Sequence, residues 1–364
     1  MPKIVIAAGG TAGHVVPALA VAEALRARGA DVEFIGGERA ESELIPAAGY
    51  PFHRVRVRGL DRRRPVRAAL ALLLAAGATL RAMRLLRTLG ADAVLGGGGY
   101  VAGPVGLAAR LTRRPLVLTE ADSHLGVTNR LLAPVAKRVF LAFPIPRRKP
   151  RLLRRRAARK WVVSGRPVPA ATGQADRAEA RARFDIGPEE PCVLVFGGSL
   201  GARRLNDAAL EAFGAGSPCA VLHASGRRDF DDLRQRLDAL GAPPYYHLHA
   251  YIEPFADALA AADLVVARAG GSVMELAAAG LPAVLVPFPH ATADHQTSNA
   301  RFIEQAGAAV VVPDAELDGP RLAREVGTLL AAPQRLGAMA KAARAVAKPD
   351  AAQRIADELI ALAS

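Results

Sequence analysis

Cysteine is nearly absent from this chain of 364 residues, which contains only Cys192 and Cys219. Two cysteines, one of them in an expected buried strand, do not make a disulfide framework and fit a reduced compartment. The chain also has no apolar run of the roughly 20 residues that cross a bilayer, because its longest candidate, residues 68–80, is flanked by arginines. Residues 1–8 lack the pattern of a secretory signal peptide. We therefore expect a cytoplasmic protein that does not span a membrane.

Acidic residues are scarce in the first part of the chain. Residues 1–160 contain 29 Lys and Arg against 10 Asp and Glu, whereas the remainder contains 19 against 24. Such an asymmetry predicts an anionic partner for the first half, either phospholipid headgroups or nucleic acid. A codon bias toward arginine is the alternative, but it would have enriched the second half as well. The basic clusters are Arg54, Arg56, Arg58, Arg62, Arg63, Arg64 and Arg67, then Arg147, Arg148, Lys149, Arg151, Arg154, Arg155, Arg156, Arg159 and Lys160.

Aromatic residues make up only 5% of the chain. Proteins that bind nucleic acid through a basic surface usually add aromatic stacking platforms or a recognisable reading motif, and neither is found here. The composition therefore disfavours nucleic-acid binding and leaves an anionic membrane surface as the preferred partner of the basic half.

Apolar strands alternate with amphipathic helical stretches in both halves, which predicts two α/β domains with doubly wound parallel sheets. Residues 161–174, with one short strand and then Gly, Pro, Ala and Thr, are typical of an interdomain connection. The expected strands are Lys3–Ala8, Val32–Ile35, Ala93–Leu95, Leu116–Thr119 and Val139–Ala142 in the first half, and Cys192–Phe196, Ala220–Ala224, Tyr246–Ala250, Leu264–Ala267 and Ala283–Pro287 in the second.

Residues 66–89 form an expected helix that is apolar except for a few arginines. Arg81, Arg84 and Arg87 follow a three-residue step, so they line one side of the helix while leucine and alanine cover the others. Such a helix is either an ordinary crossover packed on the core or a surface that lies on an anionic membrane. The arginines just before it favour the membrane interpretation.

Glycine-rich turns follow the first expected strand of each half, at residues 9–14 (GGTAGH) and 197–202 (GGSLGA). Glycine permits positive φ and close backbone approach, and the free amides at a helix start attract anions. Neither turn has the spacing of a dinucleotide fingerprint or the Lys-Ser/Thr ending of a P-loop, so a dehydrogenase or ATPase is disfavoured. Similar turns at residues 96–104 and 269–275 make four in all, which argues against a merely structural need for glycine.

Three polar features accompany these turns. His14 at the first helix start could accept a proton from an attacking hydroxyl, although a lone histidine is more often a capping or core residue. Glu275 in the fourth turn could accept hydrogen bonds from the vicinal hydroxyls of a ribose, or it could only complement the helix dipole. The polar loop of residues 290–299 fits sugar hydroxyls better than a metal, because its His and Asp spacing is not a standard ligand set.

These stretches together resemble a known family. GGTAGHVVPALAVAEAL, GGGGYVAGPVGLAA, TNRLLAP, GGSLGARRLN and RAGGSVMELAAAGLPAVLVPFPHATADHQTSNA are similar, in order, to the bacterial transferases that add N-acetylglucosamine from UDP-N-acetylglucosamine to undecaprenyl-pyrophosphoryl-N-acetylmuramyl-pentapeptide. The resemblance implies a GT-B fold of two Rossmann-like domains facing a cleft, inversion at the anomeric carbon and no cofactor or metal. It further implies a peripheral protein on the cytoplasmic face of the membrane. The expected domains are an acceptor-binding, membrane-associated domain over residues 1–163, on which a last helix over residues 350–364 packs back, and a donor-binding domain over residues 164–349.

The resemblance also assigns roles to residues. His14 is the expected catalytic base. Donor binding is assigned to Thr11, Ala12, Gly13, Ser199, Ile252, Arg268, Ala269, Gly270, Gly271, Ser272, Val273, Met274, Glu275 and Gln296. Acceptor binding is assigned to Tyr100, Glu120, Asp122 and Asn129.

The chain departs from the family pattern in two places. The family often has His-Glu-Gln-Asn where this chain has residues 119–122 (TEAD), and Gly-Asn-Pro-Val-Arg where it has residues 165–169 (GRPVP). Arg166 could then supply the guanidinium that is missing at Pro169. Rival interpretations are a UDP-N-acetylglucosamine 2-epimerase, which would not need the basic apolar surface, and a transferase acting on diacylglycerol.

Overall fold

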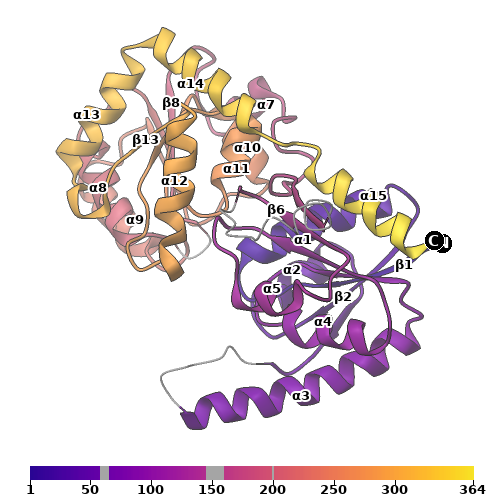
Figure 1. Cartoon of the computed structure of the whole chain (residues 1–364). Helices are drawn as coiled ribbons and strands as arrows, with labels where there is room; N and C mark the ends of the chain where they lie inside the picture. The colour runs from indigo at the N-terminus through magenta and orange to yellow at the C-terminus, as the bar shows by residue number, and fades with distance from the viewer. Residues whose placement is uncertain (58–64, 145–159, 199–200) are drawn as a thin grey trace. The chain divides into compact units, whose positions relative to one another are not determined.

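The computed structural model describes residues 1–57, 65–144, 160–198 and 201–364, which form two compact units (Figure 1). The first unit comprises Met1–Pro169 together with Lys348–Ser364, and the second comprises Ala170–Ala347. The chain thus completes the first unit only with its last helix.

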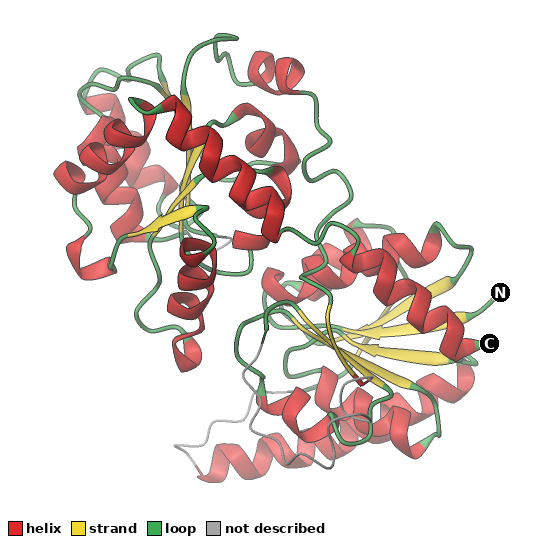
Figure 2. Cartoon of the chain, turned by 45° about the horizontal axis from the view of Figure 1, so that its top comes forward, coloured by secondary structure: helices red, strands yellow, loops and turns green. Residues whose placement is uncertain are grey.

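The first unit is built on a parallel sheet with strand order β3-β2-β1-β4-β5-β6-β7, with helices on both faces (Figure 2). Its strands are β1 (Lys3–Ala7), β2 (Asp31–Gly36), β3 (Phe52–Arg54), β4 (Ala93–Gly96), β5 (Leu116–Glu120), β6 (Arg138–Leu141) and β7 (Trp161–Val163). Its helices are α1 (Ala12–Arg26), α2 (Glu41–Ala47), α3 (Pro65–Thr88), α4 (Ala102–Leu111), α5 (Val127–Leu132) and α15 (Ala351–Ala363).

The side chains along the strands of this sheet point alternately to its two faces, and each face has its own hydrophobic core. Ile4 and Ile6 of β1 pack with helices α1 and α15, whereas Val5 and Ala7 pack with α3 and α4. Successive side chains of a strand point to opposite faces, so a strand buried on both faces is apolar throughout. Helix α15 contacts α1 and closes the first of these two cores (Figure 1).

The second unit has a parallel sheet with strand order β10-β9-β8-β11-β12-β13. Its strands are β8 (Cys192–Phe196), β9 (Ala220–Ala224), β10 (Tyr246–His249), β11 (Leu264–Ala267), β12 (Ala283–Leu285) and β13 (Ala309–Val311). Its helices are α7 (Arg177–Arg183), α8 (Arg203–Phe213), α9 (Phe230–Ala239), α10 (Phe255–Ala261), α11 (Val273–Ala279), α12 (His295–Gln305), α13 (Gly319–Leu330) and α14 (Pro333–Val346), with short 3₁₀ turns η2 (Thr292–Asp294) and η3 (Asp314–Glu316).

Both sheets reverse their strand order at the first strand. The chain runs outward from β1 to β2 and β3, returns to β4 on the other side of β1, and continues outward; β8, β9, β10 and β11 repeat this path. In such sheets, ligands bind beyond the carboxyl ends of the strands where the order reverses. The predicted class of two doubly wound parallel sheets is confirmed, and the four glycine turns follow β1, β4, β8 and β11, the strands beside the two reversals.

The sequence interpretation missed two of the shortest strands, β3 and β13, which contain three residues each. The short strand expected within residues 161–174 is β7, which also contains three residues. Backbone pairing with β6 makes Trp161–Val163 the edge of the first sheet. Three residues are too few to show the period-2 pattern that identifies a strand in a sequence.

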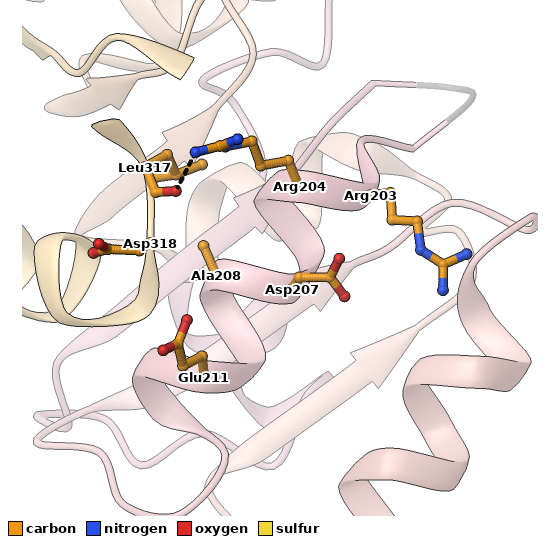
Figure 3. A pocket seen from close by; sticks show the side chains of 7 residues that line it. All are labelled: Arg203, Arg204, Asp207, Ala208, Glu211, Leu317 and Asp318. Carbon is orange, nitrogen blue, oxygen red and sulfur yellow. Dashed lines mark hydrogen bonds between the residues drawn. The ribbon is translucent and has the colours of Figure 1, made fainter. Parts of the chain in front are cut away.

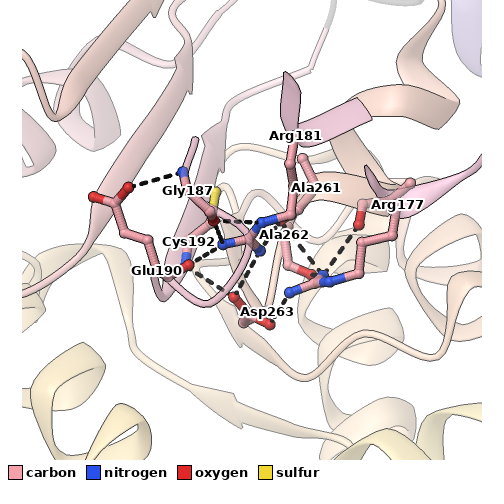
Figure 4. Close-up of polar contacts among 9 residues, drawn as sticks. Arg177, Arg181, Gly187, Glu190, Cys192, Ala261, Ala262 and Asp263 are labelled. Carbon is pink, nitrogen blue, oxygen red and sulfur yellow. Dashed lines mark hydrogen bonds and ion pairs between the residues drawn. The ribbon is translucent and has the colours of Figure 1, made fainter. Parts of the chain in front are cut away.

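In the second unit, two arginines of α7 bond residues at the amino ends of β8 and β11 (Figure 4). Arg181, whose side chain is 3% exposed, donates to the carbonyls of Gly187 and Ala261 at 2.7 and 3.0 Å and pairs with Asp263. Arg177 bonds the other carboxylate oxygen of Asp263 at 2.6 Å. The Ala261 carbonyl lies at the end of α10, where a cation complements the helix dipole. This cluster therefore holds α7 and α10 to the sheet.

A buried network of hydrogen bonds joins α8, β9 and β10 of the second unit. The amide nitrogen of Asn206 donates to Ser225 O and to Asp229 Oδ2, so its oxygen accepts from His223 Nε2 at 3.1 Å. His223 Nδ1 then accepts from the Tyr246 hydroxyl at 2.8 Å. Both ring nitrogens are satisfied by the neutral imidazole, and burial lowers the pKa of His223 to about 3.

The stability of the second unit is expected to fall in mild acid because of His223. The unfolded chain takes up a proton near pH 6.5, whereas the folded chain resists protonation down to about pH 3, so stability is lost as the pH falls through this window. The loss is about 2 to 3 kcal/mol between pH 7.5 and 4.5. Urea unfolding at several pH values should show this slope in the wild type and a flatter one in His223→Gln. The exposed His290→Gln is the control and should keep the wild-type slope.

Candidate active site

His14 lies where the strand order of the first sheet reverses. It is the third residue of α1, which follows β1, and its imidazole packs against the backbone of Gly98 in the turn after β4. A Cβ on Gly98 would come within 2.5 Å of the ring, and Gly98 has φ +96°. Glycine is therefore required at this position both for the backbone and for the close approach of His14.

The turn after β1 presents free amides beside His14. Gly10, with φ +112°, leads into Thr11, the N-cap residue of α1. Within the described part of the chain, no acceptor bonds the N–H groups of Thr11, Ala12 or Gly13. Unpaired amides at the start of a 15-residue helix favour an anionic group. The three residues could therefore hold an anionic group next to the expected base.

Three strand ends meet around the buried carboxylate of Glu41, which is 0% exposed. Its Oε2 accepts from Gly10 N at 2.9 Å, and its Oε1 accepts from Gly37 N and from the Tyr100 hydroxyl, each at 3.0 Å. These partners follow β1, β2 and β4, so one side chain joins all three turns. Burial and the charge of Glu41 raise the pKa of Tyr100 to about 12. Tyr100 is a neutral donor to Glu41 at physiological pH.

Arg166 holds the other end of the turn after β1. Its side chain is buried, and its guanidinium donates to Gly13 O at 2.6 Å and to Ala121 O at 3.2 Å. Both acceptors are backbone carbonyls of the first unit. The guanidinium thus supports the turn that carries His14.

Three of the four residues expected on the acceptor side lie between the end of β5 and α5. Glu120 Oε2 accepts from Gly126 N at 2.8 Å and from Asn129 Nδ2 at 3.0 Å, and both side chains are buried. Burial raises the pKa of the Glu120 carboxyl, although these hydrogen bonds oppose the shift. Glu120 and Asn129 therefore shape the loop, while Asp122 lies partly exposed within it.

In the second unit, the residues predicted to bind the donor gather around the turn after β11. Asn299 is fully buried and donates to Ala269 O at 3.2 Å, which fixes the start of the turn. Gln296 accepts from Phe288 N at 2.9 Å, and its amide nitrogen lies 4.0 Å from the position of a Cβ on Gly270. Glu275 follows in the first turn of α11 and is partly exposed. Glu275, Gln296 and the turn are thus brought together.

Other predicted donor residues have different surroundings. Arg268 is 8% exposed, donates to Val286 O at 3.2 Å and Pro287 O at 3.3 Å, and pairs with Asp314, so it ties β11 to β12 and η3. The side chains of Val273, Met274 and Ile252 are buried. Gly271 and Ser272 complete the turn, and Ser199 lies outside the described residues.

A separate pocket of the second unit lies over α8, between Arg203, Arg204, Asp207, Glu211 and Asp318 (Figure 3). Arg204 donates to Leu317 O at 3.1 Å, and Glu211 accepts from Gly319 N at 2.9 Å. Arg204 and Glu211 thus seat the start of α13 on α8, while Arg203 and Asp207 pair with Asp232 and Arg236 of α9, so we assign this pocket a structural role. Within the described ranges, no three His, Cys, Asp or Glu side chains are grouped to hold a metal ion.

Helix α3 presents an apolar surface to solvent. Its buried side packs on α4 (Figure 1). Leu73 and Leu80 on the other side are 72% and 58% exposed. Arg81, Arg84 and Arg87 are exposed in its last turns. Among the described residues, no helix is both long and apolar enough to cross a bilayer. Arg58, Arg62–Arg64 and Arg147–Arg159 lie outside the described residues, as does the Arg67 side chain.

Sequence reasoning missed Glu41 and gave Arg166 a different role. Glu41 lies 31 residues from Gly10, and Arg166 lies 153 residues from Gly13, so no local pattern links either pair. The only signal for Glu41 was an acidic residue shortly after a glycine pair at 36–37, a feature that surface helices share.

Two family models match the chain. Residues 4–141 match the glycosyltransferase family 28 N-terminal domain, and residues 192–355 match the glycosyltransferase family 28 C-terminal domain. The two matches cover most of both units, in the order in which the domains occur along the chain.

Similar proteins span the same length. The UDP-N-acetylglucosamine--N-acetylmuramyl-(pentapeptide) pyrophosphoryl-undecaprenol N-acetylglucosamine transferase of Salinibacter ruber is 40% identical over 375 aligned residues, which cover 100% of this chain and 97% of that protein. The crystal structure of Acinetobacter baumannii MurG has a TM-score of 0.74 and 33% identity, with 99% of each chain covered. A UDP-GlcNAc 2-epimerase from Neisseria meningitidis, with a TM-score of 0.68, 13% identity and coverage of 99% of this chain and 100% of that chain, shares the fold alone.

Proposed function

This chain belongs to glycosyltransferase family 28, and we infer that it is an N-acetylglucosaminyltransferase of peptidoglycan synthesis. It transfers N-acetylglucosamine from UDP-N-acetylglucosamine to the 4-hydroxyl of undecaprenyl-pyrophosphoryl-N-acetylmuramyl-pentapeptide. The 40% identity over the whole chain with the Salinibacter ruber transferase is the observation that carries this conclusion. The identity at this level also favours a transferase over the 2-epimerase alternative, which shares only the fold.

The donor is bound by the second unit. The amides of Gly270, Gly271 and Ser272 have no acceptor within the described ranges and face an anionic diphosphate, and the Glu275 carboxylate accepts hydrogen bonds from the ribose hydroxyls. Gln296, held beside Gly270, contacts the sugar. Arg268 positions the turn without touching the donor, because its guanidinium bonds the backbone just after β12 and pairs with Asp314.

The first unit binds the acceptor and performs the proton transfer. His14 takes the proton from the muramyl 4-hydroxyl as that oxygen attacks the anomeric carbon from the face opposite UDP, which gives inversion. The negative charge that develops on the departing diphosphate is stabilised by amides that need no reorganisation. Glu120, Asp122 and Asn129 form the acceptor side at the end of β5. Tyr100, whose hydroxyl bonds Glu41, adds to the acceptor side from the turn after β4.

The first unit also docks on an anionic membrane from the cytoplasmic side. The leucines of α3 insert among the lipid chains while the neighbouring arginines bind headgroup phosphates. The exposure of Leu73 and Leu80 beside Arg81, Arg84 and Arg87 supports this surface, and the lipid-linked acceptor gives it a purpose.

A Leu73→Glu/Leu80→Glu variant is expected to bind vesicles of phosphatidylglycerol and phosphatidylcholine at least about tenfold more weakly, because it loses apolar burial and adds repulsion. Sedimentation with vesicles measures the binding. Leu240→Glu in the second unit, where the leucine is 48% exposed, is the matched control and should bind as the wild type does. Unchanged binding of the double variant would remove α3 from the docking surface.

Incubation with labelled UDP-N-acetylglucosamine and a lipid-linked muramyl-pentapeptide tests the function. The label is expected in the lipid phase, with one UDP released for each sugar transferred. Conversion of the donor to its 2-epimer without acceptor would instead establish the isomerase, and no turnover of either kind would refute the transferase.

A further inference from the structure

We propose that Glu41 and Arg166 form a two-point clamp on the turn Gly9–His14 and are positioning residues for His14. Neither side chain needs to touch substrate for this role. Glu41 holds the start of the turn, and Arg166 holds the carbonyl immediately before His14. The proposal rests on the proposed function, because it concerns the base of that reaction.

The turn needs support from outside because its own sequence is flexible. Gly9, Gly10 and Gly13 have no side chains, and glycine loses more conformational freedom on folding than any other residue. Thr11 makes no side-chain capping bond to α1. A base whose ring must lie within hydrogen-bond reach of a hydroxyl tolerates little movement, and an error of about 1 Å costs on the order of 100-fold in rate.

Glu41 fits the start of the turn because a carboxylate only accepts. Its two oxygens receive Gly10 N, Gly37 N and the Tyr100 hydroxyl, at 2.9, 3.0 and 3.0 Å, in a site with no solvent exposure. A glutamine there would place its amide nitrogen against one of the two glycine N–H groups. The start of the turn is thereby joined to the ends of β2 and β4.

Arg166 fits the end of the turn because a guanidinium reaches two loops at once. Gly13 follows β1 and Ala121 follows β5, and β4 lies between these strands in the sheet. Neighbouring strands lie about 4.8 Å apart, so two loops that follow β1 and β5 start about 10 Å apart. The guanidinium of Arg166 has donors on both of its terminal nitrogens and bridges the two loops. Arg166 therefore ties the base to the loop of Glu120 and Asp122.

The test measures kcat in Glu41→Gln, Arg166→Met and Arg166→Lys, with each rate normalised to the folded fraction from circular dichroism at the assay temperature. We expect kcat to fall about 10- to 100-fold in E41Q and R166M, and less in R166K, whose amine bonds one loop. The KM for UDP-N-acetylglucosamine should change less than kcat does, because most of the residues assigned to the donor lie in the second unit and only Thr11–Gly13 lie in the clamped turn.

Arg26→Gln is the matched control. Arg26 donates to Gly49 O at 2.9 Å from the last residue of α1, about 20 Å from His14 along the helix. R26Q loses one exposed hydrogen bond from an arginine of α1 to a backbone carbonyl, and its kcat should stay within about twofold of the wild type. If the three clamp variants match R26Q while the wild type turns over lipid-linked acceptor, the clamp is refuted and the proposed function stands.

A double variant separates positioning from a structural effect. If Arg166 acts through His14, then R166M should add little to the loss already caused by His14→Ala, because groups that act as a unit are not additive. If R166M only damages the unit, its loss multiplies that of H14A. The second outcome would overturn the clamp, and the absence of transfer by the wild type would overturn the proposed function instead.

Discussion

A His14→Ala variant should fold normally and lose about 100- to 10,000-fold in kcat, the range that a positioned general base contributes. The muramyl hydroxyl attacks poorly while it keeps its proton, and in the first unit His14 is the predicted acceptor of that proton. Glutamine has a similar size but cannot take up the proton, so His14→Gln should lose nearly as much. Transfer of labelled sugar to the lipid-linked acceptor, at saturating donor and acceptor, measures both variants.

His53→Ala is the control for this prediction. His53 lies on β3 of the same unit and bonds Glu33 at 2.5 Å, but it takes no part in the proposed reaction. Its kcat should remain within about twofold of the wild type. UDP binding by calorimetry should also persist in H14A, which separates proton transfer from donor binding. A His14→Ala enzyme that transfers sugar at nearly the wild-type rate would eliminate His14 as the base.

An Arg181→Ala variant should destabilise the second unit by about 3 to 5 kcal/mol, the usual cost of breaking a buried ion pair. Removal of the guanidinium takes the Arg181 hydrogen bonds from the carbonyls of Gly187 and Ala261 and takes one partner from Asp263 (Figure 4). Hydrogen exchange measured by mass spectrometry reads the peptides of each unit separately. Protection should fall in residues 170–347 and should persist in residues 1–169.

Arg177→Ala provides the comparison. Arg177 binds the same Asp263 from the same helix, but its side chain is 46% exposed. Exposed pairs contribute about 0 to 1 kcal/mol, so this variant should lose far less protection than R181A. Equal losses of protection in R177A and R181A would show that burial of the arginine does not determine how much stability its removal takes away. Arg181→Lys should be intermediate, because lysine keeps the charge without the forked donors.

Much of the fold could be predicted because its signals are local. The strands β1, β5, β8 and β9 are apolar runs that end at turns, and each of them lies within a residue or two of its predicted position. The glycine-rich turns could be recognised from the sequence alone, because glycine is the residue that adopts positive φ most readily. Gly10, Gly98 and Gly198 in these turns do have positive φ. The alternation of such strands with helices favours only a few topologies.

The candidate site was predictable only in part. His14 and Glu275 were predicted because each stands next to a glycine turn, Gln296 lies in the polar loop that was predicted to bind a sugar, and the resemblance added the residues of the acceptor side. Their surroundings could not be predicted. Burial of Glu120 against Asn129 of α5, and of Arg268 against the backbone after β12, depends on segments that are separate in the sequence.

The sequence by itself determined the parallel α/β class, the glycine turns and the family, because strand periodicity, φ preference and motif order are properties of neighbouring residues. Tertiary structure decided which residues hold those turns in place. Glu41 reaches Gly10 across 31 residues, and Arg166 reaches Gly13 across 153 residues. The physical reason is that a buried charge is placed by the hydrogen bonds available to it, and distant segments supply them.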